Sequence, residues 1–154
     1  MIDHAATVTI QKPVADVFKF VAMDYFQNHP KWDPRVVEIQ RTSGSGPIAV
    51  GTTGREVRKQ GGRTIVYTWE VSEFAPASRL GFKATSGTAR FASTYTFEPA
   101  GQATKFSMHF VFQMGGLMRL AEPLMAGGFR KEIDKTAQTI KEMAEAQPSG
   151  GARR

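Results

Sequence analysis

Hydrophobic and polar residues alternate along several segments of the chain, which is the pattern of β-strands with one buried face. The first such segment places Ala6, Val8 and Ile10 on one side. Six more lie between residues 36 and 113, and glycine-containing turns such as Gly61-Gly62 separate several of them. Because short links make neighbouring strands antiparallel, the pattern predicts one antiparallel sheet in meander order. The six later segments are centred on 37–39, 52–59, 65–72, 80–84, 91–97 and 106–112.

Two short helices are predicted between the first and second strands. Pro13 suits the first position of a helix, and the helical spacing of apolar residues around Phe18 continues to about residue 21. Asp24 can cap a further helical turn. That second helix is expected to end by His29, because Pro30 disfavours helical geometry in the residue before it.

The chain changes to helical spacing after Gly115-Gly116. Apolar residues three or four positions apart form one stripe with charged residues opposite, so the pattern predicts a long amphipathic helix that covers the sheet. Pro123 should start this helix afresh or kink it, and Gly127-Gly128 should weaken its first half by about 1 kcal/mol per glycine. The stripe comprises Leu117, Leu120, Leu124, Phe129, Ile133, Ala137, Ile140 and Ala144.

A length of 154 residues, with 41% hydrophobic and 22% charged residues, is typical of one globular domain. We place this α+β domain at 1–146 and a flexible tail at 147–154. No apolar run approaches the roughly 20 residues needed to cross a bilayer, and the N-terminal residues lack the pattern of a secretory signal, so a cytoplasmic location is expected. The absence of cysteine excludes disulfides, thiolate metal sites and cysteine nucleophiles.

The net charge of +6 raises the question of an anionic partner. The positive charges are dispersed, however, since some lie in the tail and others around one predicted hairpin. A solvated basic surface is therefore favoured over a nucleic-acid site. The residues concerned are Arg153 and Arg154 in the tail, and Arg55, Arg58, Lys59 and Arg63 around the hairpin.

The predicted inner face of the sheet is aromatic but also carries the hydroxyl groups of Tyr67, Ser93 and Tyr95. One interpretation is a solid aromatic core. The other is a pocket, because a curved seven-stranded sheet is hard to fill with one helix and buried tyrosine or tryptophan polar atoms need partners. If there is a pocket, we expect the first half of the terminal helix and the loop 43–51 to open for ligand entry.

Several of these features resemble the START-like (SRPBCC) superfamily, and specifically its polyketide cyclase and dehydrase-like branch. The resemblance covers residues 3 to 146 and rests on the strand-helix-helix-strand opening and on diffuse motifs. It implies a helix-grip fold in which the curved sheet and the terminal helix enclose a deep hydrophobic cavity. The motifs are His29-Pro30-Lys31-Trp32-Asp33-Pro34, the Gly61-Gly62-Arg63 turn followed by Tyr67, Trp69 and Val71, and Pro76 with Leu80.

The candidate ligand-binding residues are those that the alternation and the helical spacing direct inward. Arg55 is the best polar candidate, because it shares a strand face with Val57, and a buried arginine requires a carboxylate or a ligand anion to balance its charge. The complete set is Arg55, Tyr67, Trp69, Phe91, Ser93, Tyr95, Met108, Phe110, Phe112, Leu124, Met125 and Phe129.

The sequence gives little sign of catalysis. The only histidines, His4, His29 and His109, do not converge in the pattern, so neither a metal site nor an acid–base pair is predicted. Nucleotide-binding loops and a nucleophile elbow are absent from the sequence. We therefore assign no catalytic residue, no metal and no cofactor.

Three functions remain open. The aromatic inner face without a catalytic cluster favours a protein that binds a hydrophobic small molecule, such as a lipid, an aromatic metabolite or a polyketide-like compound. The second hypothesis is an aromatase/cyclase or dehydratase that acts on a polyketide-like substrate. The third is a toxin-like or regulatory protein of the same superfamily. The oligomeric state is also open, with a homodimer among the options.

Overall fold

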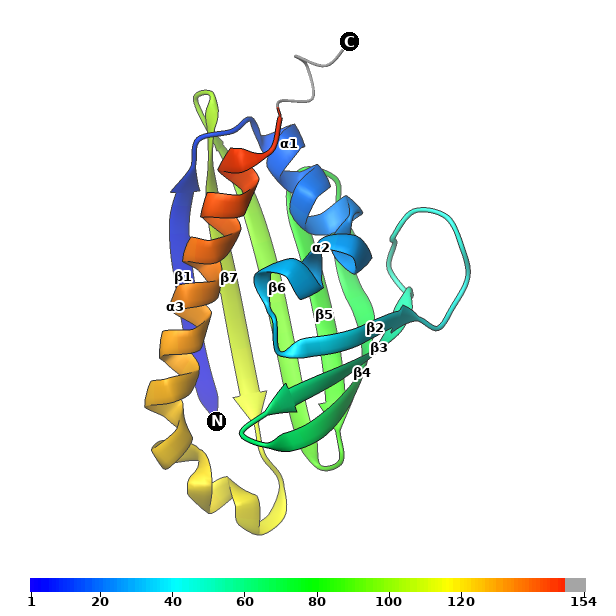
Figure 1. The fold of residues 1–154 in the computed structure, drawn as a ribbon, viewed down its shortest axis with the longest axis vertical. Coiled ribbons are helices and arrows are strands. Elements are labelled where there is room, and N and C mark those ends of the chain that lie inside the picture. Colours follow the sequence, from blue (N-terminus) through cyan, green and yellow to red (C-terminus); the bar gives the residue numbers. More distant parts are fainter. Residues whose placement is uncertain (149–154) are drawn as a thin grey trace.

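Seven strands form one strongly curved antiparallel sheet, and the computed structural model describes the chain over residues 1–148 (Figure 1). The strand order across the sheet is β1-β7-β6-β5-β4-β3-β2, and every neighbouring pair is antiparallel. The predicted meander is therefore confirmed, whereas most of the predicted tail lies outside the described residues. The strands are β1 (Ile2–Ile10), β2 (Val36–Arg41), β3 (Thr53–Gln60), β4 (Arg63–Ala75), β5 (Arg79–Ser86), β6 (Ala89–Ala100) and β7 (Ala103–Gln113).

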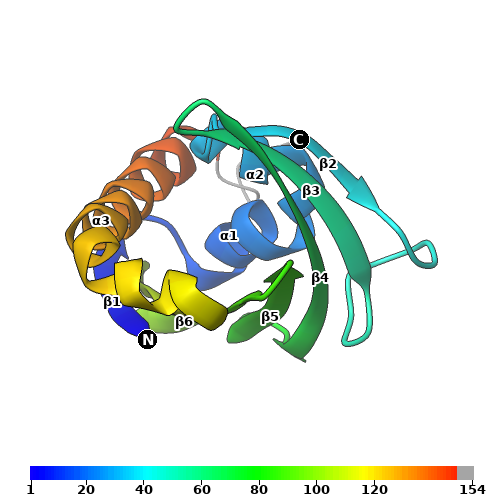
Figure 2. The same ribbon diagram turned by 90° about the horizontal axis from the view of Figure 1, so that it is seen from below.

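The helices all lie on the concave side of the sheet. α1 and α2 sit together at one end, and α3 runs along β1 and β7 (Figures 1 and 2). The Lys141 ammonium donates to the Thr9 carbonyl at 2.6 Å and so fixes α3 to β1. This is the α+β arrangement that the pattern predicts and the helix-grip fold that the family resemblance implies. The helical segments are α1 (Val14–Phe18), a π-helical turn (Lys19–Met23), α2 (Tyr25–Trp32), a 3₁₀-helix (Gly116–Ala121) and α3 (Glu122–Ala146).

α2 does not end at His29, so that part of the sequence prediction is wrong. The helix continues through Pro30 to Trp32, and the Asp33 N–H still donates to the His29 carbonyl at 3.0 Å. Tyr25, His29 and Trp32 are all buried. Their packing outweighs the preference of the residue before a proline for non-helical geometry, which is a tendency and not a rule.

The single apolar stripe predicted after Gly116 is also wrong in its first half. Ile133 and Ile140 are buried against the sheet, but Leu117, Leu120 and Leu124 are 86%, 80% and 89% exposed. The physical reason is position: the 3₁₀-helix and the start of α3 lie beyond the end of the sheet (Figure 1), where no apolar surface is available to cover them.

The space between sheet and helices is filled at the α1 end. Phe18 packs edge-on against Phe97 with ring centroids 5.0 Å apart, and Phe106 and Ile10 are completely buried there. Towards the opposite end the side chains leave a hollow. The two interpretations of the inner face, a solid core and a pocket, thus each describe one end of the molecule.

Candidate functional site

A cavity of about 850 Å³ lies between the concave face of the sheet, α2 and the first half of α3. Its closed end is formed by α2, and its mouth is bordered by the β3–β4 turn, the β5–β6 turn and the 3₁₀-helix. Figure 2 views the molecule from the mouth end. Residues of the loop 43–51 do not line the cavity, and the loop projects from the far side of β2 and β3 (Figure 1), so the structure does not place it at the entrance.

Most residues predicted to face a ligand lie together on the cavity wall. Phe91 is central among them, because its ring meets Phe110 at 5.4 Å and Tyr67 at 5.9 Å between centroids, both edge-on. Phe129 of α3 stacks on Phe112 at 5.5 Å. The predicted residues found on the wall are Tyr67, Trp69, Phe91, Ser93, Tyr95, Met108, Phe110, Phe112, Met125 and Phe129.

Two of the predicted residues lie elsewhere. Arg55 is on the outer face of β3, where its side chain is 40% exposed and pairs with Glu38 at 3.5 Å. The prediction assumed that Val57 faces inward, but Glu56 is paired across the sheet with Tyr67, a wall residue, so it is the even-numbered side chains of β3 that face the cavity. Leu124 points to solvent at the mouth for the reason given above.

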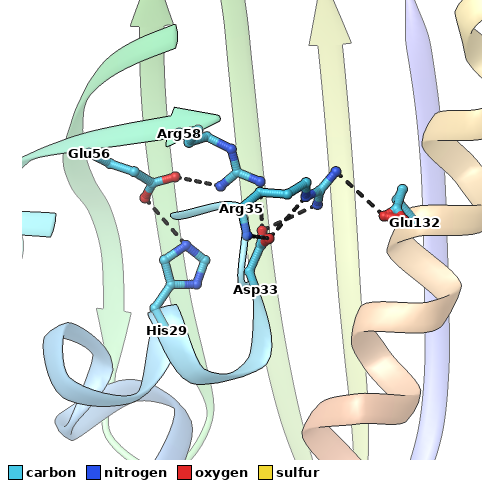
Figure 3. A network of polar contacts seen from close by, with 6 residues as sticks. All are labelled: His29, Asp33, Arg35, Glu56, Arg58 and Glu132. Atoms are coloured by element: carbon cyan, nitrogen blue, oxygen red, sulfur yellow. Dashed lines mark hydrogen bonds and ion pairs between the residues drawn. The ribbon is translucent and has the colours of Figure 1, made fainter. Parts of the chain in front are cut away.

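Charged residues form a buried network on one wall of the cavity (Figure 3). Glu56 accepts a hydrogen bond from Arg58 at 2.6 Å, and its other oxygen lies 3.3 Å from Nε2 of His29. The second terminal guanidinium nitrogen of Arg58 donates to Asp33 at 2.6 Å. The His29, Asp33 and Glu56 side chains are each 8% exposed and that of Arg58 is 12% exposed, so these contacts are shielded from water.

The network continues to α3 through two more residues. The Arg35 guanidinium donates to both carboxylate oxygens of Asp33, at 3.0 and 3.3 Å. Its remaining terminal nitrogen lies 3.5 Å from Glu132 on α3. This ion pair links the segment after α2 to the helix on the opposite wall (Figure 3).

The pairing keeps the buried groups charged. Burial by itself would raise the pKa of Asp33, but the guanidinium groups of Arg58 and Arg35 lower it to about 2. Burial also opposes ionisation of Glu56, whose pKa nevertheless falls below its usual range because His29 and Arg58 hydrogen-bond to it. The two carboxylates raise the pKa of Arg58 above its usual range, against the effect of burial. With Arg35 and Glu132 included, three carboxylates face two guanidinium groups.

Two tyrosine hydroxyls lie at the closed end of the cavity. Tyr25 stacks on His29 with ring centroids 4.7 Å apart and also contacts Phe82 at 4.7 Å. Burial is the main cause that raises the pKa of both Tyr25 and Tyr95, so both remain neutral hydrogen-bonding groups. Three buried nitrogen atoms of the described residues have no hydrogen-bond partner: Nδ1 of His29, Nε1 of Trp32 and Nε1 of Trp69.

The sequence interpretation missed the charged wall, although a signal for it was present. A two-residue turn at Gly61-Gly62 pairs Gln60 with Arg63, and counting back along the hairpin places Glu56 opposite Tyr67. Two charges of opposite sign at i and i+2 on a strand share one face. Their partner His29 lies in α2, and Asp33 directly follows that helix. Only the tertiary fold brings these two residues to β3.

Fold and site together define a class of protein: a helix-grip domain with an aromatic internal cavity and a buried charged wall. A family model described as polyketide cyclase/dehydrase and lipid transport matches residues 1–145. The chain therefore belongs to this family. No protein with a curated description matches it by sequence. Within residues 1–148 we find neither a metal-binding cluster of His, Asp and Glu nor a helix long and apolar enough to cross a membrane.

Solved structures support the same fold at low sequence identity. The protein TTHA0849 from Thermus thermophilus is 17% identical, with a TM-score of 0.76 over 94% of this chain and 97% of that one. A START superfamily protein from Mycobacterium smegmatis is 13% identical, with a TM-score of 0.76 over 93% and 97%. The Zhui aromatase/cyclase from Streptomyces sp. R1128 is 11% identical, with a TM-score of 0.75 over 97% of both chains.

Proposed function

We propose that the protein binds a hydrophobic small molecule, such as a lipid, an aromatic metabolite or a polyketide-like compound, in its internal cavity. The observation that carries the proposal is the cavity of about 850 Å³ with an aromatic wall. Ligand sites typically measure about 300–1,000 Å³ and combine apolar walls with a few polar groups. The family to which the chain belongs is described by polyketide chemistry and lipid transport, which fits a ligand of this kind.

The charged wall narrows the chemistry of the ligand. Both terminal nitrogens of Arg58 are already paired with carboxylates, so this arginine does not offer a free positive charge to a ligand anion. Arg35 is likewise paired, with Asp33 and Glu132. A ligand with a neutral polar end, such as a carbonyl or hydroxyl group, therefore suits this wall better than a carboxylate.

Filling the cavity tests the proposal. Ala84 lies on the cavity wall, so the indole of Ala84→Trp should occupy the hollow. Ala92 lies between the wall residues Phe91 and Ser93 and therefore faces the convex side of the sheet, which makes Ala92→Trp a matched control. Fluorescence titration with the neutral apolar probe N-phenyl-naphthylamine should show binding to the wild type and to the control. Binding should be weakened by about tenfold or more, roughly 1.4 kcal/mol, in Ala84→Trp.

Two results would contradict the proposal. The first is the absence of probe binding by delipidated wild-type protein. The second is equal affinity of the probe for Ala84→Trp and the wild type, which would place the bound probe outside the cavity. Native mass spectrometry of the purified protein would in addition identify any ligand that stays bound.

A second candidate function is cyclisation or dehydration of a polyketide-like substrate, and the His29–Glu56 pair favours it. If Nε2–H of His29 donates to Glu56, Nδ1 of the neutral ring is a hydrogen-bond acceptor, and this atom has no partner among the described residues. Such a base could take a proton from the carbon between two carbonyl groups. The resulting carbanion would attack another carbonyl carbon of the chain and close the ring, and the new alkoxide would take back the proton held by His29. Loss of water would then leave a carbon–carbon double bond in the ring.

Chromatography with mass spectrometry can follow this reaction on a linear poly-β-ketone thioester. Cyclised product should form with the wild type and fall by about a hundredfold or more in His29→Ala, the lower end of what a general base contributes. His109→Ala is the control, because His109 is exposed and lies on the outer face of the sheet. Retained probe binding by His29→Ala would separate lost chemistry from a lost cavity. Equal turnover by His29→Ala and the wild type would exclude this role.

A further inference from the structure

Exposed apolar side chains gather at the mouth of the cavity. Ten large apolar residues of the described chain are exposed, and five of them belong to the short segment 117–125. We call these five residues the mouth patch. Three of them are leucines that are each at least 80% exposed, and such clustering of exposed apolar side chains marks interaction sites. The mouth patch comprises Leu117, Met118, Leu120, Leu124 and Met125.

Closing the segment over the cavity would not bury the leucines. Met118 and Met125 already line the cavity, whereas the leucines do not. At helical spacing Leu117, Leu120 and Leu124 fall on one face, and the two methionines fall on another. The segment is also anchored, because Glu122 is buried and accepts the Met114 N–H at 2.6 Å. The leucine face therefore needs an apolar partner outside the molecule.

The charges around the mouth patch are positive. Arg119 lies within the segment and Arg130 follows it on α3. Arg63 and Arg90 lie beside the β3–β4 and β5–β6 turns, which reach the same end of the molecule (Figure 1). All four side chains are exposed and none forms an ion pair with a residue in 1–148. The acidic residue within the segment, Glu122, is buried and already hydrogen-bonded.

We propose that the mouth patch docks on the surface of an anionic phospholipid bilayer. Exposed leucines together with exposed arginines at the same end of the molecule combine insertion into the acyl region with attraction to negative headgroups. These two contributions hold peripheral proteins on membranes. The cavity opens beside the patch, so docking turns its entrance towards the lipid. Docking itself does not require an occupied cavity, whereas exchange of a ligand with the bilayer rests on the proposed function.

Co-sedimentation with lipid vesicles tests the proposal. The wild type should bind vesicles of phosphatidylcholine with phosphatidylglycerol, bind pure phosphatidylcholine at least about tenfold more weakly, and be released as salt is raised. Leu117→Ser/Leu120→Ser/Leu124→Ser should lower binding to the anionic vesicles by about tenfold or more. The control is Val37→Ser/Val50→Ser, which removes two exposed apolar side chains far from the mouth and should leave binding unchanged.

Each other outcome overturns the proposal. One is no binding to either kind of vesicle, and another is unchanged binding by the leucine variant. A third is a wild type that is a dimer in sedimentation equilibrium while the leucine variant is a monomer. The patch would then be an interface between two copies. The leucine variant should still bind N-phenyl-naphthylamine in the absence of vesicles. A loss of vesicle binding can then be told apart from a loss of the proposed ligand binding. Since the leucines are exposed, the variant should fold like the wild type.

Discussion

At the level of single residues, the position of Trp69 depends on the absence of a side chain across the sheet. Gly54 is the cross-strand partner of Trp69, and a Cβ at residue 54 would overlap the indole ring. The indole can therefore lie flat over β3 and form part of the cavity wall. A glycine in a strand usually weakens it, and here it marks the close approach of a large ring.

We predict that Gly54→Ala destabilises the protein by about 1–3 kcal/mol, because the indole must move in a packed region. Urea unfolding measures this change. Gly127→Ala is the matched control: a Cβ there meets nothing within 4 Å, and alanine in the interior of α3 should stabilise the protein by up to about 1 kcal/mol. Equal stability of Gly54→Ala and the wild type would show that Trp69 does not occupy this position.

Ionisation of the Asp33 carboxyl makes the free energy of unfolding depend on pH. Its pKa of about 2 in the folded protein is below the value of 3.8 for a free aspartate. A lowered pKa contributes stability that is present above the unfolded value and is lost as the pH falls towards the folded value. Between about pH 6 and about pH 3, this carboxyl alone should remove about 1 kcal/mol from the free energy of unfolding.

The test compares pH profiles of urea unfolding in Asp33→Asn and the wild type. The variant will be less stable at every pH, because Arg58 and Arg35 lose a buried partner, but its profile should be flatter by the stated amount. Asp134→Asn, which changes a carboxyl that is 59% exposed, serves as the control. Parallel profiles of Asp33→Asn and the wild type would contradict the lowered pKa.

At the level of secondary-structure elements, α3 is one continuous helix with two different environments. Its second half packs on β1 and β7, with Ala137 and Ile140 completely buried. Its first half extends past the sheet and carries Leu124 at 89% exposure. The same hydrophobic spacing runs through both halves, so only the position of the sheet edge separates core residues from surface residues.

Two substitutions of similar size in α3 should therefore differ strongly in their effect on the free energy of unfolding. Ile140→Ala should destabilise the protein by about 2–5 kcal/mol, because it removes buried methyl groups and leaves a cavity. Leu124→Ala should change the free energy of unfolding by less than about 0.5 kcal/mol. Urea unfolding of both variants decides this. A large effect of Leu124→Ala would mean that the first half of α3 packs on protein surface.

Across the whole molecule, we expect the free energy of local opening to be higher at the α1 end than at the mouth end. The α1 end is filled with packed aromatic rings, whereas the mouth end surrounds a hollow and carries the exposed start of α3. Opening free energies follow the density of buried contacts. The loop 43–51 should open less readily than the mouth, because Ile48 within it is 5% exposed and belongs to the core.

Amide hydrogen exchange should display this gradient. We predict faster exchange over residues 117–130 than over residues 133–144 of the same helix, and slowing in 117–130 when N-phenyl-naphthylamine is added. The amide of Gly51, which donates to the Val71 carbonyl at 2.9 Å, should be protected as in a strand. Uniform slow exchange over 117–144 would contradict an entrance at this end.

Local patterns in the sequence were enough to predict the elements and their order. Alternation in β1, β4, β6 and β7 and the helical period of α3 follow from local burial, and the short turns left the meander as the simple topology. The aromatic residues of the cavity wall were predictable for the same reason, since Phe91, Ser93 and Tyr95 alternate on one strand. The resemblance to a family added the expectation of a cavity.

Three other features did not follow from the alternation or the helical period of single segments. The inward face of β3 depended on its register with β4, which put Glu56 and Arg58 in the cavity and Arg55 outside. The continuation of α2 through Pro30 depended on packing that local preference does not include. The charged wall depended on contacts between α2, β3 and α3, which are distant in sequence. Periodicity reports which residues avoid water, and only three-dimensional packing settles which buried polar groups meet.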